Sequence, residues 1–152
     1  MRNGDTTRAG GNRKRMPHTT AGTRSAADEA EVAFFWPRMT TIYKICETAQ
    51  WAQAERNGTF GGSAVDLADG YIHFSTAAQV ADTAAKHFAG MSDLVLVAVA
   101  TEDLGDALKW ETSRGGALFP HLYGPLPMVA ARWVQALLLD HDGRHLLPPL
   151  EA

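Results

Sequence analysis

Two rows of polar side chains carry the residue types that could bind, or act on, a small ligand. Successive side chains of an extended segment point to opposite faces, so Tyr71, His73 and Ser75 are expected to share one face. The same alternation places His121 and Tyr123 together in a later segment. Aromatic rings stack on flat ligands, and imidazoles and hydroxyls form hydrogen bonds with sugar hydroxyl groups. The two rows therefore predict a site for a nucleotide or a sugar-containing ligand.

A third group, formed by Trp110, Glu111 and Arg114, comes shortly before the second row. A carboxylate can stabilise the positive charge that develops at an anomeric carbon when a glycosidic bond breaks. Each residue also has a plainer interpretation, since a tryptophan is more often part of a core and a glutamate is more often a solvated surface residue. Three polar groups on separate segments nevertheless favour a common site, provided that the segments lie side by side.

Other chemistries find less support. Cys46 is the only cysteine, so neither an internal disulfide nor a multi-cysteine metal site can form. His73 and His121 are far apart in sequence, unlike the closely spaced ligands of a metal-binding helix, and we expect no metal. The glycine-rich segment 58–63 lacks the Gly-Lys-Ser/Thr ending of a phosphate-binding loop and is interpreted as a flexible connection or a lid. A Ser/His nucleophile pair stays open, although Ser75 lacks a Gly-x-Ser-x-Gly elbow.

Composition and charge narrow the class of protein. With 152 residues, 45% apolar and 20% charged, the chain is ordinary for a soluble globular protein that buries one core. Residues 1–38 carry seven basic and four acidic side chains, whereas residues 39–152 carry seven basic and thirteen acidic ones. The acidic second part argues against a general nucleic-acid surface. No apolar run reaches the roughly 18 residues of a membrane span, so we predict a cytoplasmic protein without a membrane partner.

The first part of the chain differs from the rest. Residues 1–33 are rich in Gly, Thr, Arg, Asn and Ala and show no apolar periodicity, which predicts disorder. Arg13-Lys14-Arg15 could tether an RNA or a membrane. The favoured interpretation is that Met39 is the natural start and that the preceding residues are upstream sequence. We therefore predict an N-terminal extension over residues 1–38 and a single globular domain over residues 39–152.

Several segments would position the polar rows. The β-branched and aromatic residues of 41–46 predict a strand, and residues 48–56 predict a helix. The continuous apolar run 93–100 predicts a central strand that is covered on both faces. Thr76 and Gln79 have the spacing of a capping box, which predicts a helix that begins directly after the first polar row.

The second half is harder to assign. Residues 108–112 predict a short strand. Pro120 has no amide to donate, so the segment 118–126 is expected at a sheet edge or in a loop. Residues 129–147 fit either a helix followed by a strand or a hairpin that turns at Asp142-Gly143, and the Asp-Gly turn favours the hairpin.

Short motifs occur in a characteristic order along residues 40–150. They are Ile42-Tyr43-Lys44-Ile45, Trp51, Gly70–Thr76, His87-Phe88, Leu94–Val97, Trp110-Glu111 and Phe119–Leu126. Together they resemble the bacterial family known as Domain of Unknown Function 952, which has been grouped at the level of fold with ADP-ribosyltransferase-like proteins. The resemblance implies an α+β domain with a small split mixed or antiparallel sheet, two or three helices and a cleft for NAD.

The resemblance also implies roles for individual residues. His73 is similar to the cleft residue that orients the nicotinamide-side ribose, and Glu111 and His121 would stabilise charge or transfer a proton, so these three are the candidate catalytic residues. The candidate ligand-binding residues are Tyr43, Lys44, Tyr71, Ser75, Thr76, Trp110, Arg114 and Tyr123. Two functions stay open: an enzyme that binds NAD or a related nucleotide and acts at its ribosyl carbon, and a module that binds a nucleotide or sugar without turnover.

Overall fold

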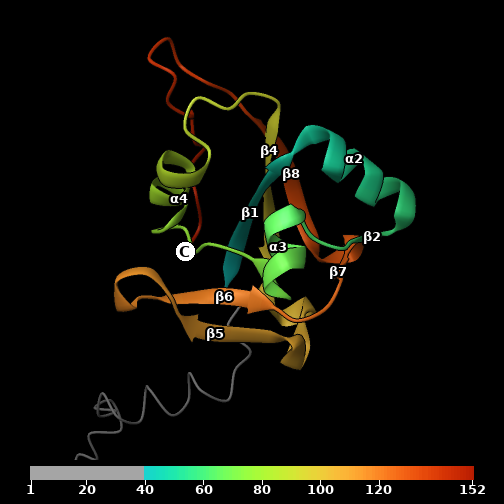
Figure 1. Cartoon of the computed structure of the whole chain (residues 1–152). Helices are drawn as coiled ribbons and strands as arrows, with labels where there is room; N and C mark the ends of the chain where they lie inside the picture. Colours follow the sequence, from blue (N-terminus) through green and yellow to red (C-terminus); the bar gives the residue numbers. More distant parts are fainter. Residues whose placement is uncertain (1–39) are drawn as a thin grey trace, which may run out of the picture. The chain divides into compact units, whose positions relative to one another are not determined.

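The structure, a computed structural model, describes residues 40–152 (Figure 1). The predicted extension over residues 1–38, with its disorder and its basic run, lies outside the described residues. Within residues 40–152, three α-helices and eight strands follow the order β1 (Thr41–Glu47), α2 (Thr48–Asn57), β2 (Thr59–Phe60), α3 (Ala64–Asp69), β3 (Ile72–His73), α4 (Val80–His87), β4 (Leu94–Ala100), β5 (Leu108–Thr112), β6 (Leu118–Leu122), β7 (Leu126–Pro127) and β8 (Ala131–Leu137). Short 3-10 turns lie at Thr101–Asp103, Gly105–Ala107, Arg114–Gly116 and Met128–Ala130.

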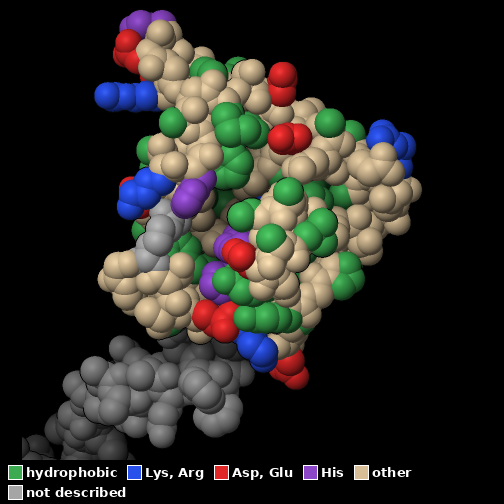
Figure 2. Space-filling model, in the orientation of Figure 1, with side chains coloured by type: hydrophobic (Ala, Val, Ile, Leu, Met, Phe, Trp, Pro, Cys, Tyr) green, Lys and Arg blue, Asp and Glu red, His purple; other side chains and the backbone are tan. Residues whose placement is uncertain are grey.

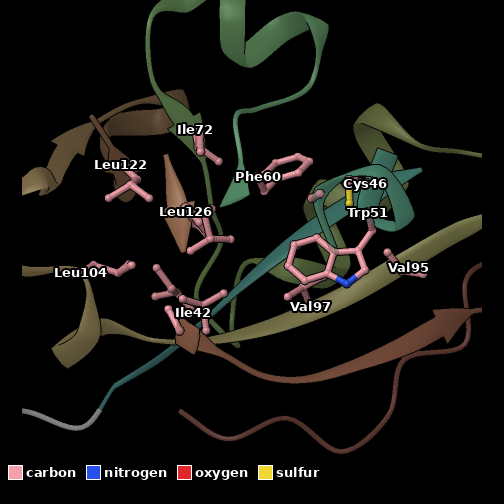
Figure 3. Close-up of a cluster of buried hydrophobic side chains, with 14 residues drawn as sticks. Ile42, Cys46, Trp51, Phe60, Ile72, Val95, Val97, Leu104, Leu122 and Leu126 are labelled. Atoms are coloured by element: carbon pink, nitrogen blue, oxygen red, sulfur yellow. The ribbon is translucent and has the colours of Figure 1, made fainter. Parts of the chain in front are cut away.

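The first sheet has the strand order β1-β4-β8, with both pairings antiparallel. Every residue of β4 is buried, as the continuous valine-rich run predicts. Val95, Val97 and Val99 pack with Trp51 of α2 on one face, which Figure 3 shows in part, whereas Leu94, Leu96 and Ala98 pack with Val80 and Ala84 of α4 on the other. The alternation of one strand thus builds two cores and fixes α2 and α4 on opposite faces.

The second sheet has the order β3-β6-β5, again antiparallel, and β2 and β7 form a two-stranded ladder. β6 is the middle strand, so the expectation that the Pro120 segment lies at a sheet edge or in a loop is wrong. The carbonyl of Pro120 accepts a hydrogen bond from the Phe74 amide (3.0 Å), and the nitrogen of the same residue points the same way, towards a position just beyond the two residues of β3. Its missing amide therefore removes no bond of the β3 ladder.

A β-bridge between Tyr43 and Ser75 links the first sheet to the segment that follows β3 of the second sheet. The amide of Tyr43 donates to the carbonyl of Ser75 (2.8 Å), and the amide of Ser75 donates to the carbonyl of Tyr43 (2.9 Å). The bridge holds the segment after β3 against β1, beside the start of α4. The polar row around His73 consequently faces side chains from β1 as well as from β6.

Two helices, α4 and α3, differ from the prediction made from the sequence. α4 begins at Val80 rather than at Thr76, because residues 77–79 form a turn in which Gln79 Oε1 accepts from the Thr76 amide (3.0 Å). Helix α3 was not predicted at all. It begins with a capping box in which Ser63 and Asp66 each bind the other's main-chain amide, and it ends at Gly70, whose φ of 88° suits a residue without a side chain.

The described residues 129–147 contain no α-helix, so the alternative of a helix followed by a strand is wrong, and the hairpin forms only in part. β8 pairs with β4 rather than forming a long hairpin, and the expected turn at Asp142-Gly143 is closed by one bridge between Leu139 and His145. The chain then returns to β1, where the Tyr43 hydroxyl bonds both the amide and the carbonyl of Glu151 (2.8 Å each). The α+β class, the small antiparallel sheets and the three helices are confirmed. Among residues 40–152, no helix combines the length and apolarity that crossing a bilayer requires.

Candidate functional site

A cavity of about 590 Å³ lies between β1, α3, β3, α4 and β6. Figure 2 shows histidine and acidic side chains gathered around a hollow on this face. Five predicted site residues line it, together with Asp69 and the histidine of α4, His87. The five are Tyr43, Lys44, His73, Ser75 and His121. His73 and Ser75 of the first predicted row and His121 of the second therefore line the same pocket.

His73 is held between two carboxylates. Its Nδ1 lies 2.6 Å from Asp66 Oδ1, its Nε2 lies 2.9 Å from Asp69 Oδ2, and its side chain is 32% exposed. Both contacts are hydrogen bonds at the same time only when the imidazole carries a proton on each nitrogen. The ring is thus fixed in orientation, and of its two carboxylate partners Asp69 lines the pocket whereas Asp66 does not.

Asp66 is the buried centre of this arrangement, with a side chain that is only 1% exposed. Its Oδ2 accepts from Lys44 Nζ (2.7 Å) and from the Ser63 amide (2.8 Å), and its Oδ1 accepts from the His73 amide (3.1 Å) as well as from the ring. Burial on its own raises the pKa of Asp66, but the hydrogen bond from His73 and the charge of Lys44 outweigh it and hold this pKa well below its usual value. Asp66 is therefore an ionised group that the protein satisfies internally.

Lys44 plays the complementary part. Its side chain is 5% exposed, and burial lowers the pKa of its ammonium against the opposing attraction of Asp66. The ammonium contacts the Asp66 carboxylate, although the residue lines the pocket. We infer that the Lys44 ammonium mainly neutralises the Asp66 carboxylate.

His121 has a carboxylate partner of its own. Its Nδ1 lies 2.9 Å from Glu111 Oε1, and the same oxygen accepts from the Tyr123 hydroxyl at 2.7 Å. The hydrogen bonds from Tyr123 and His121 lower the pKa of Glu111, and in return the bond to Glu111, together with burial, raises the pKa of Tyr123 to about 12. Tyr71 stacks on the His121 ring, with centroids 4.1 Å apart and planes inclined by 23°.

The two histidines meet because of strand register. His73 of β3 and His121 of β6 are direct cross-strand partners, and their ring centroids are 5.5 Å apart. Directly opposed residues in an antiparallel pair share one face of the sheet. Two imidazoles, each with a carboxylate at Nδ1, consequently stand side by side at the pocket.

Other predicted residues take supporting positions. The hydroxyl of Ser75 lies 3.0 Å from that of Thr83 on α4. Tyr43 is almost fully buried, with its ring tilted against Trp133, so most of the residue belongs to the core. Thr76 contributes its amide to the turn before α4. Burial raises the pKa of Cys46 to about 12, so its thiol is not a ready nucleophile at neutral pH.

Among the predicted residues whose side chains are described, Tyr71, Thr76 and Trp110 do not line the pocket. Trp110 is 43% exposed and precedes Glu111 on β5, so strand alternation turns the two to opposite faces. Arg114 lies in the turn after β5, and its side chain falls outside the described part of the chain. Glu111 and Tyr123 are absent from the lining too, and they reach the pocket through His121.

Sequence reasoning missed the two aspartates that hold His73. A signal was present, since Ser63-Ala64-Val65-Asp66 has the Ser-x-x-acid spacing of a capping box and predicts a helix start. Nothing local, however, indicates that Asp66 also meets Lys44 and His73. In the described part of the chain, no group of three or more His, Cys, Asp or Glu side chains is arranged to hold a metal ion.

Fold and site together define a small α+β domain with a pocket built around two carboxylate-held histidines. The chain belongs to the family described as "Protein of unknown function (DUF952)", which matches residues 45–134. It is similar to the protein CC0527 from Caulobacter crescentus. The crystal structure of CC0527 is 54% identical over 70% of this chain and 94% of that one, with a TM-score of 0.68. Its solution NMR structure is 56% identical over 70% and 91%, with a TM-score of 0.63. No curated protein matches the chain.

Proposed function

We propose that the pocket binds a nucleotide of the ADP-ribose type, with NAD as the first ligand to test, and acts at its ribosyl carbon. The observation that carries the proposal is the meeting of His73 and His121 in one pocket, each with a carboxylate at Nδ1. Paired imidazoles that are held in orientation suit both the binding of ribose hydroxyls and the transfer of a proton.

The lining fits the parts of such a ligand. A volume of about 590 Å³ lies within the range of about 300–1,000 Å³ that small-molecule pockets occupy. Phe88 and Phe119 supply apolar ring surface for a flat base. Ser75 and Thr83 supply hydroxyls. Because Lys44 is engaged with Asp66, a pyrophosphate would depend on the Nε2–H group of His73 as a donor.

The geometry also suggests how the chemistry would be divided. In ribosyl transfer, the bond from the anomeric carbon to its leaving nitrogen breaks, the nitrogen keeps the electron pair, and an acceptor oxygen bonds the carbon as it loses a proton. With Nδ1 of His121 donating to Glu111, Nε2 is the ring atom that can take this proton. In this scheme Glu111 orients His121, and Asp69 and Glu47 are the carboxylate residues that line the pocket.

Calorimetric titration of NAD tests the proposal. We expect heat of binding with the wild type and at least a tenfold loss of affinity in His73→Ala. His141→Ala serves as the matched control, because His141 is almost fully exposed and does not line the pocket. Wild-type protein that binds neither NAD nor ADP-ribose would remove this class of ligand.

A second candidate, a binding module without turnover, is favoured by one observation. Nε2 of His73 is already bonded to Asp69, so a ligand oxygen must compete with that carboxylate for the ring. Chromatography of long incubations with NAD separates the two functions. Release of nicotinamide above that of a His121→Ala variant supports the enzyme, whereas binding without release supports the module.

A further inference from the structure

We propose that Asp66 is the positioning residue of the site: it binds Nδ1 of His73, turns Nε2 towards the pocket and decides which ring nitrogens carry protons. This inference deepens the proposed function, because it concerns the residue that would meet the ribose. Its structural basis, however, consists of contacts within the protein and does not depend on the identity of the ligand.

Asp66 fixes both the main chain and the imidazole ring of His73. One oxygen, Asp66 Oδ1, accepts from the main-chain amide of His73 at 3.1 Å and from Nδ1 of its ring at 2.6 Å. The main-chain carbonyl of Asp66 also accepts a hydrogen bond (3.2 Å) from the amide of Tyr71, which lies two residues before His73. Backbone and side chain of His73 are therefore anchored to the same residue, which leaves the imidazole little freedom to flip.

The other contacts of Asp66 hold it as a negatively charged carboxylate. Oδ2 is held by two donors, Lys44 Nζ at 2.7 Å and the Ser63 amide at 2.8 Å, so it must act as an acceptor. Gly62 packs closely behind, since a Cβ at that position would lie 2.8 Å from the Cβ of Asp66. A carboxylate with this set of partners offers only lone pairs to Nδ1, and Nδ1 must therefore carry the proton.

The consequence appears at the other end of the ring. Nε2 faces Asp69 Oδ2 at 2.9 Å, on the pocket side, and acts as a donor there. A ligand that reaches His73 then meets an N–H group, which selects an acceptor oxygen such as that of a ribose hydroxyl or a phosphate. Asp66 itself is 1% exposed and does not need to touch the ligand.

Nitrogen-15 NMR of the histidine ring tests the assignment. In Asp66→Asn, the amide oxygen is expected to keep the Lys44 and Ser63 donors, so the NH₂ group faces Nδ1 and makes it an acceptor, and the bond from the His73 main-chain amide is lost. We expect a protonated Nδ1 signal in the wild type and an unprotonated one in Asp66→Asn. Asp69→Asn is the matched control, because it alters the partner of Nε2 and leaves Nδ1 protonated.

Two outcomes would overturn the inference: a wild-type His73 whose neutral ring carries its proton on Nε2, or a folded Asp66→Asn variant with an unchanged Nδ1 signal. The first readout needs only the wild type, so it decides the matter even if the variant unfolds. A failure of NAD to bind would overturn the proposed function and leave this result intact, so the two failures are distinguishable.

Discussion

Lys44 Nζ lies 2.7 Å from Asp66 Oδ2, and both side chains are almost completely buried. Removing one partner of a buried pair leaves an uncompensated charge, which costs roughly 3–5 kcal/mol. The pair therefore links the stability of the domain to the orientation of His73, and both can be measured.

We expect Lys44→Met to lower the free energy of unfolding by roughly 3–5 kcal/mol, measured by urea denaturation. The control is Lys86→Met, which breaks an exposed pair with Asp82 on α4 and should cost at most about 0.5 kcal/mol. Adding Asp66→Asn to Lys44→Met should recover part of the loss, since a neutral amide needs no counter-charge. Equal effects of the two lysine substitutions would contradict a buried ion pair.

The lowered pKa of Asp66 predicts a specific response to acid. A carboxylate whose folded pKa is depressed contributes stability that is fully present above its unfolded pKa, about 3.9, and is lost as the pH falls through the folded value. Between neutral pH and pH values below about 4, the wild type should lose more stability than Asp66→Asn. Urea titrations across this range measure the difference, with Asp82→Asn as an exposed control. Parallel pH profiles for wild type and Asp66→Asn would count against the assignment.

Gly62 should be sensitive to a single methyl group. Its φ is 116°, and an added Cβ would lie 2.8 Å from that of Asp66. We expect Gly62→Ala to destabilise the domain by roughly 1–3 kcal/mol, through backbone strain together with the close contact to Asp66, and to disturb the NMR signals of His73. Gly61→Ala, one residue earlier, meets nothing within 4 Å and should change neither quantity. Thermal unfolding of both variants makes the comparison, and matching losses would be inconsistent with the close contact.

The hydroxyl of Tyr123 reports on the second dyad. Its pKa is raised to about 12 chiefly by the bond to Glu111, so Glu111→Gln should lower this pKa towards the ordinary value for tyrosine. Ultraviolet absorbance follows the formation of tyrosinate as the pH is raised. Glu102→Gln is the control, because Glu102 bonds Arg132 and no tyrosine in the described residues. An unchanged titration curve in Glu111→Gln would mean that the hydrogen bond is not kept in solution.

Sequence reasoning succeeded where the pattern is local. The valine-rich run predicted β4, because a strand that is buried on both faces needs no alternation. Alternation within each segment placed His73 and His121 on polar rows, but their meeting required the register between β3 and β6. Alternation could also have separated Trp110 from Glu111, two neighbours that one strand turns to opposite faces.

It failed where a residue is defined by distant partners. Asp66 draws its donors from β1, from the residue before α3 and from β3, so no window of sequence contains the arrangement. For Pro120 the prediction from the sequence was wrong, because a local rule was applied without knowledge of the neighbouring strand. Its missing amide was taken to require an edge, yet the neighbouring strand is so short that a middle position costs no ladder bond.

The site depends on the six-residue helix α3, which carries Asp66 and must be folded for the site to be intact. Its amides at Leu67 and Gly70 donate to Ser63 and Asp66, so their hydrogen exchange with solvent follows each opening of the helix. Whenever α3 opens, the carboxylate that steers the imidazole leaves with it. Ligand binding at this pocket therefore requires that the roughly 1.7 turns of α3 stay folded.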